Sequence, residues 1–494
     1  MTRGIQANLH IRVRNISKKS LALMFVESWA DTKGKVSTIQ QLLDWINERN
    51  RAIKVEIRKI ALEDSSYWFL NHDKGIITNK TGSFFSIYGL MQRRAGEVIK
   101  EHPIILQEEI GYLGIITKDI DGVLHFLMQA KVEPGNINKI QISPTIQATK
   151  SNFTKKHGGA NQPYLDYFLN AQKYTIVVDQ IQSEQNSRFF KKRNRNIIIL
   201  VNDAPEELPS HHWMTLGQIK ELMRYDNLVN MDTRTVLSCI PYSFMPFRDG
   251  ERELAVSLFC DKSLFKSVFE REQADNVLTS AYHSINNYKM FNDAISQLVR
   301  LDELRDWFMT DTEFICRGKS DFKIIFCDIE IEGREVKKWT QPLFEASGKA
   351  NFGLIMYNDD GVKKFLVSGN PEVGCFDQIE IGPTIQAEAS NEIEDSGPLN
   401  KFFFNYIQQH PDSVRYDVLL SEEGGRFFHE QNRNIIIQVP KESIPWESIK
   451  GQNYFSASYN TLNILTQVNN SLNIQLRNLL SLLRTSAKDL QGAI

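Results

Sequence analysis

The chain repeats itself, and this constrains its fold more than any other feature of the sequence. The pentapeptide PTIQA begins at Pro144 and again at Pro383, 239 residues later. Nearly the same offset joins RFFKKRNRNIII at 188–199 to RFFHEQNRNIII at 426–437. Order and spacing persist over about 200 residues, which is the signature of a repeated structural unit. We therefore interpret the chain as two copies of one module.

The repeat also sets the predicted domain boundaries. A chain of 494 residues is too long for one ordinary hydrophobic core, so more than one domain is expected. We predict two copies joined by a linker, with the active site in the first copy and a catalytically degenerate second copy. The segments are an N-terminal extension (1–34), the first copy (35–245), the linker (246–279) and the second copy (280–494).

Each copy mixes helix and strand signals, without a regular β-α-β alternation, so the predicted class is α+β. Short runs such as VLHFLMQAKV at 123–132 indicate strands. Ser37 and Gln40 resemble a capping box that would begin a helix. Both copies end in a helical pattern.

One face of the predicted strand 123–132 is polar. Side chains alternate across a strand, so Leu124, Phe126, Met128, Ala130 and Val132 would share the opposite, apolar face. The polar face carries candidate catalytic residues, namely His125, Gln129, Lys131 and Glu133. Their counterparts in the second copy are Lys364, Ser368, Asn370 and Glu372.

Two further candidates are also lost in the second copy. Glu109 corresponds to Gly348, and His157 falls near Ser396 in a shortened loop. A module that keeps its glycines and loses its polar groups suggests one working site and one degenerate site. The alternative is a solvated face that drifted freely after duplication.

A second group of candidate functional residues is basic and lies in SRFFKKRNRN at 187–196. Guanidinium groups bind phosphate oxygens in a bidentate fork, so this run suits a diphosphate. The candidates are Arg188, Lys192, Arg193, Arg195 and Asn196. A charged turn before a strand is the alternative, and nucleic-acid binding is a weaker one because the net charge is −2.

Several classes of enzyme are disfavoured because their characteristic motifs are absent from the sequence. It has no G-x-G-x-x-G fingerprint, no phosphate-binding loop, no H-E-x-x-H motif and no G-x-S-x-G elbow. His211 and His212 are adjacent, and we expect them in a loop beside Trp213 rather than on a metal. Five scattered cysteines and the lack of a secretory leader favour a cytoplasmic protein. Because the sequence has no long apolar run and a net charge of −2, we expect it to bind neither a membrane nor nucleic acid.

Five motifs together carry a family resemblance: QEEIGYLGII (107–116), LMQAKVEPGN (127–136), SPTIQATKSNF (143–153), SEQNSRFFKKRNRN (183–196) and LVNMDTRTVLSCIP (228–241). In sequence, order and two-copy layout they resemble the NDP-hexose 2,3-dehydratases, which make 2-deoxysugars for antibiotics and surface glycans. The resemblance implies two Nudix-like modules per chain and a homodimer. The fragments at 96–102 and 333–339 do not complete a Nudix box, so metal-dependent diphosphate cleavage is not expected.

The resemblance also implies a reaction. The substrate would be a dTDP-4-keto-6-deoxyhexose, and the product a 2,6-dideoxy-3,4-diketo sugar nucleotide that a 3-ketoreductase or 3-aminotransferase consumes. Removal of the C3 proton and loss of the C2 hydroxyl need no hydride and no cofactor. They need a base, an acid near C2 and a donor to the C4 oxyanion.

We assign catalytic and binding roles to the candidate residues as hypotheses. Glu133 or Glu109 would be the base, Lys131 the oxyanion donor or acid, and Gln129 would orient the sugar, with His125 and His157 in reserve. Tyr164 or Phe168 would stack on thymine. The remaining substrate-binding candidates are Thr145, Gln147, Ser151 and Asn152. Two rival functions stay open: a related sugar-nucleotide isomerase, and a non-catalytic sugar-nucleotide-binding protein.

Overall fold

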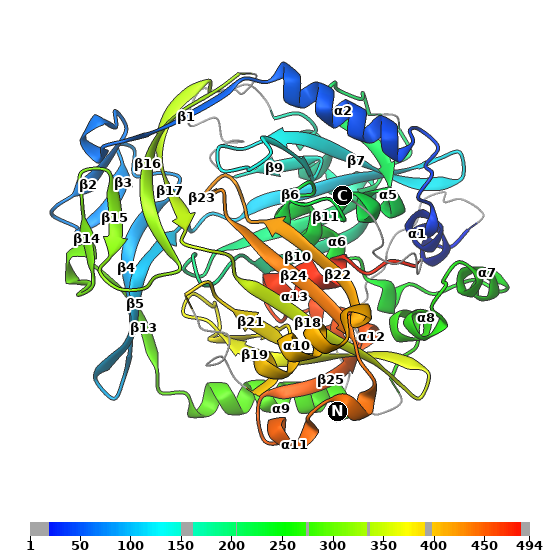
Figure 1. Ribbon diagram of the computed structural model, residues 1–494. Coiled ribbons are helices and arrows are strands. Elements are labelled where there is room, and N and C mark those ends of the chain that lie inside the picture. Colours follow the sequence, from blue (N-terminus) through cyan, green and yellow to red (C-terminus); the bar gives the residue numbers. More distant parts are fainter. Residues whose placement is uncertain are drawn as a thin grey trace, which may run out of the picture.

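The computed structural model describes residues 19–149, 162–203, 205–272, 276–332, 336–390 and 398–485. Within them, helices and strands are mixed, and each half carries a sheet of the same topology (Figure 1). The α+β class and the two-copy layout are therefore confirmed. The helices are α1 (Leu21–Ala30), α2 (Ile39–Ala52), α4 (Leu165–Leu169), α5 (Leu216–Leu222), α6 (Met231–Ser238), α7 (Glu251–Ser257), α8 (Lys262–Phe269), α9 (Asn276–Phe291), α10 (Pro398–Gln409), α11 (Trp446–Ile449), α12 (Tyr459–Thr466) and α13 (Ile474–Ser481).

Each copy has a seven-stranded sheet with one parallel pair beside antiparallel neighbours. In the first copy the order is β10-β11-β6-β7-β12, with β8 on β7 and β9 on β6. The bounds are β6 (Gly111–Ile120), β7 (Val123–Val132), β8 (Ile140–Ser143), β9 (Ile146–Ala148), β10 (Thr175–Ser183), β11 (Arg193–Leu200) and β12 (His211–Thr215). His211 and His212 are therefore in a strand, and the expectation of a loop was wrong.

The second copy repeats this sheet in the order β22-β24-β18-β19-β20, with β21 on β18 and β25 on β19. The bounds are β18 (Asn351–Asp359), β19 (Val362–Pro371), β20 (Ile379–Gly382), β21 (Ile385–Ala387), β22 (Val414–Ser421), β24 (Gln431–Gln438) and β25 (Tyr454–Ser458). Helices α6 and α13 pack against each other, and α6 packs on the sheet of the first copy while α13 packs on that of the second. They join the two halves in one hydrophobic core.

Two smaller sheets exchange strands between the copies. One contains β2 (Trp68–Asn71), β3 (Ile76–Asn79), β4 (Ser86–Arg94) and β5 (Glu97–Leu106), and takes β13 (Ile295–Val299) from the second copy. The other contains β14 (Trp307–Met309), β15 (Glu313–Cys316), β16 (Phe322–Ile331), β17 (Lys338–Ala346) and β23 (Phe427–Phe428), and takes β1 (Val55–Ile60) from the first. In Figure 1 the blue β1 runs beside the yellow-green β16.

Helices α1 and α8 occupy equivalent places, although both precede the predicted start of their copies. α1 packs on β7, and α8 packs on β19, the counterpart of β7. The Ser28 hydroxyl donates to the carbonyl of Leu124 and accepts from the amide of Leu216. Ser267 does the same with Lys363 and Tyr459. The repeated structure thus extends into the predicted N-terminal extension and linker, while the predicted boundaries themselves stay a prediction.

The capping box at the start of α2 lies one residue later than the sequence suggested. Thr38 is the N-cap and pairs reciprocally with Gln41. The Ser37 hydroxyl instead forms a 2.7 Å hydrogen bond with Nε2 of His212. Either pairing satisfies the S/T-x-x-Q spacing, so tertiary contact with β12 decides between them.

The alternation predicted for β7 is confirmed. Its apolar face, from Leu124 to Val132, is part of the main hydrophobic core. Its other face is fully buried at His125 and Leu127 and half-buried from Gln129 onward. Glu133 follows the last residue of the strand. The polar end of β7 is therefore the place where this sheet can carry a site.

Candidate functional site

A lysine–glutamate pair lies at the polar end of β7. Nζ of Lys131 is 2.9 Å from Oε1 of Glu133, and the two side chains are only 16% and 6% exposed. Gln129, two residues earlier on the same face, lies opposite Ser143 of β8 and His211 of β12. These three predicted residues share one end of one strand.

His125 lies at the other end of β7 and is fully buried. Its Nδ1 donates to the carbonyl of Val123 at 2.9 Å, and its Nε2 accepts from the amide of Lys35 at 3.3 Å. Burial lowers its pKa. Both ring nitrogens are thus hydrogen-bonded to the backbone, which favours a structural role. His157, Ser151 and Asn152 lie outside the described residues.

Three more carboxyl groups surround the lysine–glutamate pair, and the sequence reasoning missed them. Asp232 lies in the first turn of α6, Glu184 follows β10, and Glu423 follows β22 of the second copy. Burial raises the pKa of Asp232 well above its usual value, and the charges of Glu184, Glu423 and Glu133 act in the same direction. Burial and Glu423 raise the pKa of Glu184 to about 7.

A signal for one of these residues was present in the repeat. NLVNMDTRTVLS at 227–238 corresponds to NSLNIQLRNLLS at 470–481, and this match replaces Asp232 by Gln475. Glu423 also differs from its counterpart, Gln185, but the sequence does not show that it reaches the first copy. Glu184 corresponds to Glu422, so the repeat gives no signal for it.

Lys192 belongs to the same surroundings. Its ammonium group donates to the backbone carbonyl of Glu109, and the amide of Glu184 donates to the carbonyl of Lys192 at 3.1 Å. Burial lowers the pKa of Lys192 to about 8. Oε1 of Glu184 accepts a 2.7 Å hydrogen bond from Asn194, while Oε2 is buried without a hydrogen-bond partner.

Arg188 lies among residues of the second copy. Its guanidinium group stacks on Phe322 with 4.3 Å to the ring centroid. It is 3.8 Å from the carboxylates of Glu388 and Glu430. The predicted basic cluster is therefore divided, because Arg188 crosses to the second copy while Lys192 stays with the first.

The reciprocal arginine is Arg426, which corresponds to Arg188 and enters the first copy. Nη2 of Arg426 donates to Oε1 of Gln107 at 3.0 Å. Its guanidinium group lies 4.2 Å from the ring centroid of Phe84 and 4.7 Å from that of Phe85. Each copy thus receives a buried arginine from the other.

The other predicted diphosphate ligands do not converge. Arg195 forms a bidentate pair with Asp179, and Arg433 forms the same pair with Asp417 in the second copy. Arg193 stacks on Phe376 at 4.0 Å, and buried Asn196 donates to the carbonyl of Asn194. The arginine–aspartate pair is common to both copies, which favours a structural role.

Phe168 and Thr145 also have counterparts with the same contacts. Phe168 packs on Gly114, where a side chain would overlap its ring, and Phe403 packs on Gly353 in the same way. The Thr145 hydroxyl accepts from the amide of Ile116 and donates to the carbonyl of Leu127. Thr384 repeats these two bonds.

Tyr164 and Gln147 lie nearer the polar end of β7. The Tyr164 hydroxyl donates to the carbonyl of Glu206, and its ring meets His211 edge to face at 4.7 Å between centroids. Oε1 of Gln147 accepts from Ser143 at 2.5 Å and from Asn230 at 3.3 Å. Gln147 therefore links β9 to the start of α6.

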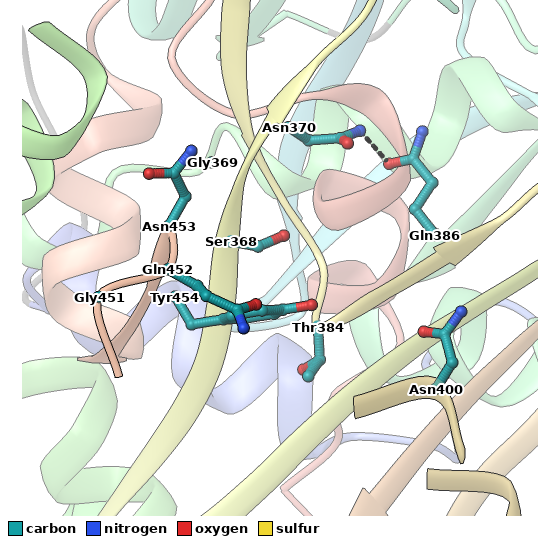
Figure 2. Close-up of a pocket in the computed structure, with 10 residues that line it drawn as sticks. All are labelled: Ser368, Gly369, Asn370, Thr384, Gln386, Asn400, Gly451, Gln452, Asn453 and Tyr454. Atoms are coloured by element: carbon teal, nitrogen blue, oxygen red, sulfur yellow. Dashed lines mark hydrogen bonds between the residues drawn. The ribbon is translucent and has the colours of Figure 1, made fainter. Parts of the chain in front are cut away.

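The second copy has a pocket of about 440 Å³ at the equivalent place (Figure 2). None of its lining residues is charged; they are Ser368, Gly369, Asn370, Thr384, Gln386, Asn400, Gly451, Gln452, Asn453 and Tyr454. Asn370, the counterpart of Lys131, donates to Gln386 at 2.6 Å. Gln386 in turn donates to Glu372 at 3.2 Å.

Glu372 corresponds to Glu133 and has different neighbours. Burial, with Glu388 and Glu380 nearby, raises its pKa to about 8. It is therefore a neutral acid near pH 7, in contact with an amide instead of an ammonium group. The same residue type contacts an ammonium group in one copy and an amide in the other.

In the described ranges, no group of three or more His, Cys, Asp or Glu side chains has the arrangement of a metal site. Over the same ranges, no helix is long and apolar enough to cross a membrane.

A buried lysine–glutamate pair among further carboxyl groups with raised pKa values is typical of enzymes that transfer protons. The family model described as NDP-hexose 2,3-dehydratase matches residues 39–240 and again 279–483. The chain therefore belongs to this family.

Three curated relatives carry the name dTDP-4-dehydro-6-deoxy-alpha-D-glucopyranose 2,3-dehydratase. The protein of Saccharopolyspora spinosa is 37% identical over 459 residues, covering 89% of this chain and 90% of its own length. That of Amycolatopsis orientalis is 33% identical and covers 94% of both chains. That of Streptomyces violaceoruber is 34% identical, covering 89% of this chain and 96% of its own length.

Proposed function

We propose that the chain is a hydro-lyase that dehydrates a dTDP-4-keto-6-deoxyhexose across C2 and C3. The observation that carries the proposal is the buried Lys131–Glu133 pair at 2.9 Å. The names of the relatives supply the substrate class. The product would be a 3,4-diketo-2,6-dideoxy sugar nucleotide in deoxysugar biosynthesis.

The chemistry assigns complementary roles to the pair. The C3 hydrogen is acidic because it lies next to the C4 ketone, and Glu133 would remove it. Lys131 has three N–H donors, so it can hold Glu133 with one and the developing C4 oxyanion with another. Gln129, on the same face of β7, would orient the sugar. Glu133 is preferred to Glu109 as the base because Glu133 provides the carboxyl group that Lys131 contacts at the polar end of β7.

The first copy is preferred as the catalytic copy because it has charged side chains where the second copy has amides. At the equivalent place the second copy has Asn370 for Lys131 and Gln475 for Asp232. Glu372 persists there without an ammonium partner, and burial raises its pKa to about 8. A neutral acid in contact with an amide cannot act as a general base near pH 7.

Further features belong to the same proposal on the strength of family membership. The modules would be Nudix-like, the protein would act as a cytoplasmic homodimer, and a 3-ketoreductase or 3-aminotransferase would consume the labile product. Lys192 would help to hold the diphosphate, since it is a buried cation beside the site. The elimination moves protons and no hydride, so the proposed reaction requires no cofactor.

The test is incubation with dTDP-4-keto-6-deoxyglucose, a 3-ketoreductase and NADPH, followed by mass spectrometry. We expect loss of water and then reduction. Lys131→Ala and Glu133→Gln should each lower the rate by about 100-fold or more, since each removes an oxyanion donor or a general base. Asn370→Ala is the matched control in the second copy and should retain the rate.

Other results would favour the rival functions. Wild-type rates in both Lys131→Ala and Glu133→Gln would remove these residues from the mechanism. Proton NMR that shows the C2 oxygen retained in the product would favour an isomerase. Binding of the dTDP-sugar by calorimetry with no turnover would favour a non-catalytic binding protein.

A further inference from the structure

Two loops cross between the copies, and each forms a hydrogen bond with a turn of the other copy. We call residues 184–192 and 422–430 the crossing loops. The amide of Gly135 in the first copy donates to the carbonyl of Gly424 at 2.7 Å. The amide of Gly374 in the second copy donates to the carbonyl of Asn186 at 3.0 Å. Each crossing loop is thus fixed to the turn that follows the polar strand of the other copy.

The contact leaves no room for a side chain at either glycine. A side chain at Gly135 would overlap the carbonyl oxygen of Phe427, and one at Gly374 would overlap those of Phe189 and Asn186. The amide of His429 also donates to the carbonyl of Gly135 at 2.9 Å. The second crossing loop is therefore held in a defined position beside Glu133.

Glu423 is the residue that this loop brings to the site. A Cβ atom on Gly425 would lie 2.7 Å from Oε1 of Glu423 and 3.5 Å from Oε1 of Glu133. Both carboxyl oxygens thus lie within 3.5 Å of one point. Glu423 also interacts electrostatically with Arg426, whose Nη1 is 3.8 Å from its Oε1, and with Lys131 and Lys192. A residue of the second copy is therefore part of the surroundings of the first copy's proposed base.

The repeat shows that this carboxyl group is specific to one site. The residue that corresponds to Glu423 in the first crossing loop is Gln185, which reaches toward the second copy. Gln185 interacts there with Glu430. The first copy's site thus gains an acid where the second copy's site gains an amide. This matches the replacement of Lys131 by Asn370 and of Asp232 by Gln475.

We propose that Glu423, supplied by the second copy, is the catalytic acid that protonates the departing C2 hydroxyl. The inference rests on the proposed dehydratase function and adds the group that completes it. The second copy would then be retained because it builds the active site of the first. Its loss of charged groups affects only its own pocket.

The steps balance with these two carboxyl groups. Glu133 takes the C3 proton, and the electron pair forms the C3–C4 double bond with the charge on the C4 oxygen. The C4 carbonyl then re-forms, C2 and C3 become doubly bonded, and the C2–O bond breaks. Glu423 gives its proton to the leaving hydroxyl, which departs as water.

Tautomerisation of the resulting 3-enol restores both groups. Glu423, now a carboxylate, takes the proton of the C3 hydroxyl, and Glu133 returns its proton to C2. Burial raises the pKa of Glu423 by more than the charges of Arg426, Lys131 and Lys192 lower it, which favours the protonated, donor form. No oxidant, reductant or further reactant is needed.

The test separates proton removal from elimination. The full chain is incubated in D₂O with dTDP-4-keto-6-deoxyglucose, and deuterium at C3 of recovered substrate is measured by NMR beside water loss. We expect Glu423→Gln to lower elimination by about 100-fold or more, while C3 exchange stays within tenfold of wild type. Glu133→Gln should lose both, and Glu372→Gln, the control in the second copy, should lose neither.

The dependence of the elimination rate on pH provides a second test. Wild-type elimination should fall at high pH as the acid loses its proton, and Glu423→Gln should lack this alkaline fall. If Glu423→Gln does not fold, Glu423→Asp keeps the carboxyl group and should show the same selective loss of elimination to a smaller degree.

Four outcomes would overturn the inference. The first is elimination at the wild-type rate in Glu423→Gln, and the second is an equal loss of C3 exchange and elimination in that variant. The third is a ratio of elimination to C3 exchange in Glu423→Asp that equals the wild-type ratio. The fourth is a loss of elimination with C3 exchange retained in Asp232→Asn and not in Glu423→Gln. A wild-type chain that neither exchanges C3 nor releases water would instead contradict the proposed dehydratase function itself.

Discussion

One glutamate occurs in both copies, and its partner decides its chemistry. Glu133 is 2.9 Å from the ammonium group of Lys131. Glu372 accepts a hydrogen bond from Gln386, and its second oxygen is buried without a hydrogen-bond partner. Burial, with the charges of Glu388 and Glu380, outweighs the charge of Lys100 and favours the neutral form of Glu372. Persistence of this glutamate in the second copy therefore does not count against a catalytic role for Glu133.

The neutral state of Glu372 predicts a pH effect on stability. Its pKa is about 8 in the folded chain and near the ordinary value of 4.5 when unfolded. Between these values the unfolded chain releases the proton while the folded chain keeps it. The contribution of Glu372 to stability is thus fully present below pH 4.5 and lost as the pH rises toward 8.

Glu372→Gln should remove that dependence, because the amide does not titrate. The free energy of unfolding of wild type relative to Glu372→Gln should fall between pH 5 and 8 by at most about 1.4 kcal/mol per pH unit. Urea denaturation of both proteins at several pH values measures the difference. A difference that stays constant, or that grows with pH, would show that Glu372 is ionised in the folded chain.

The residues of the site were only partly predictable from the sequence. The side-chain alternation of β7 placed Gln129, Lys131 and Glu133 together correctly, because period two is a local property. The basic run gave no indication that Arg188 and Lys192 point to different copies. That division depends on the path of a crossing loop, which is a tertiary feature.

At the scale of elements, α1 and α8 form equivalent supports under the two sheets. Each uses one buried serine to join the carbonyl of a strand to the first amide of a helix. The residues are Ser28 with Leu124 and Leu216, and Ser267 with Lys363 and Tyr459. The sequence reasoning placed α1 and α8 outside the copies, because LALMFVESWA and KSLFKSVF are too different for the repeat to be seen there.

These serines predict matched effects on stability. Ser28→Ala and Ser267→Ala each leave a buried amide and a buried carbonyl without this partner, which costs roughly 1–3 kcal/mol. Urea denaturation should show a similar loss in both variants. Ser257→Ala, at an exposed hydroxyl bonded to the carbonyl of Leu254, is the control and should stay within about 0.5 kcal/mol of wild type. A loss in only one of the two serine variants would contradict the equivalence of α1 and α8.

At the scale of the whole molecule, the copies are interlocked and do not form two separate domains. β1 completes a sheet of the second copy, β13 completes a sheet of the first, and the crossing loops fix the polar turns. The repeat correctly predicted two similar units. It could not predict the exchange, because β1 and β13 hold equivalent places in the sequence and each could pair within its own copy or with the other.

The interlock predicts that both copies unfold together. Loss of either exchanged strand exposes a sheet edge in the other copy, so neither half retains a complete fold when its partner opens. We expect one transition in urea when tryptophan fluorescence and far-UV circular dichroism are followed together. Two separated transitions would show that the copies are independent.

Gly135→Ala tests the interlock directly, since its added methyl group would overlap the carbonyl of Phe427 in the other copy. Overpacking of this kind costs typically about 1–3 kcal/mol. The whole transition should move to lower urea by that amount and remain single, because the strain acts on a contact that both copies share. Gly318→Ala, where an added methyl group meets no atom within 4 Å, should leave the midpoint in place. A Gly135→Ala transition that splits into a shifted part and an unshifted part would mean that the crossing loops do not couple the two copies.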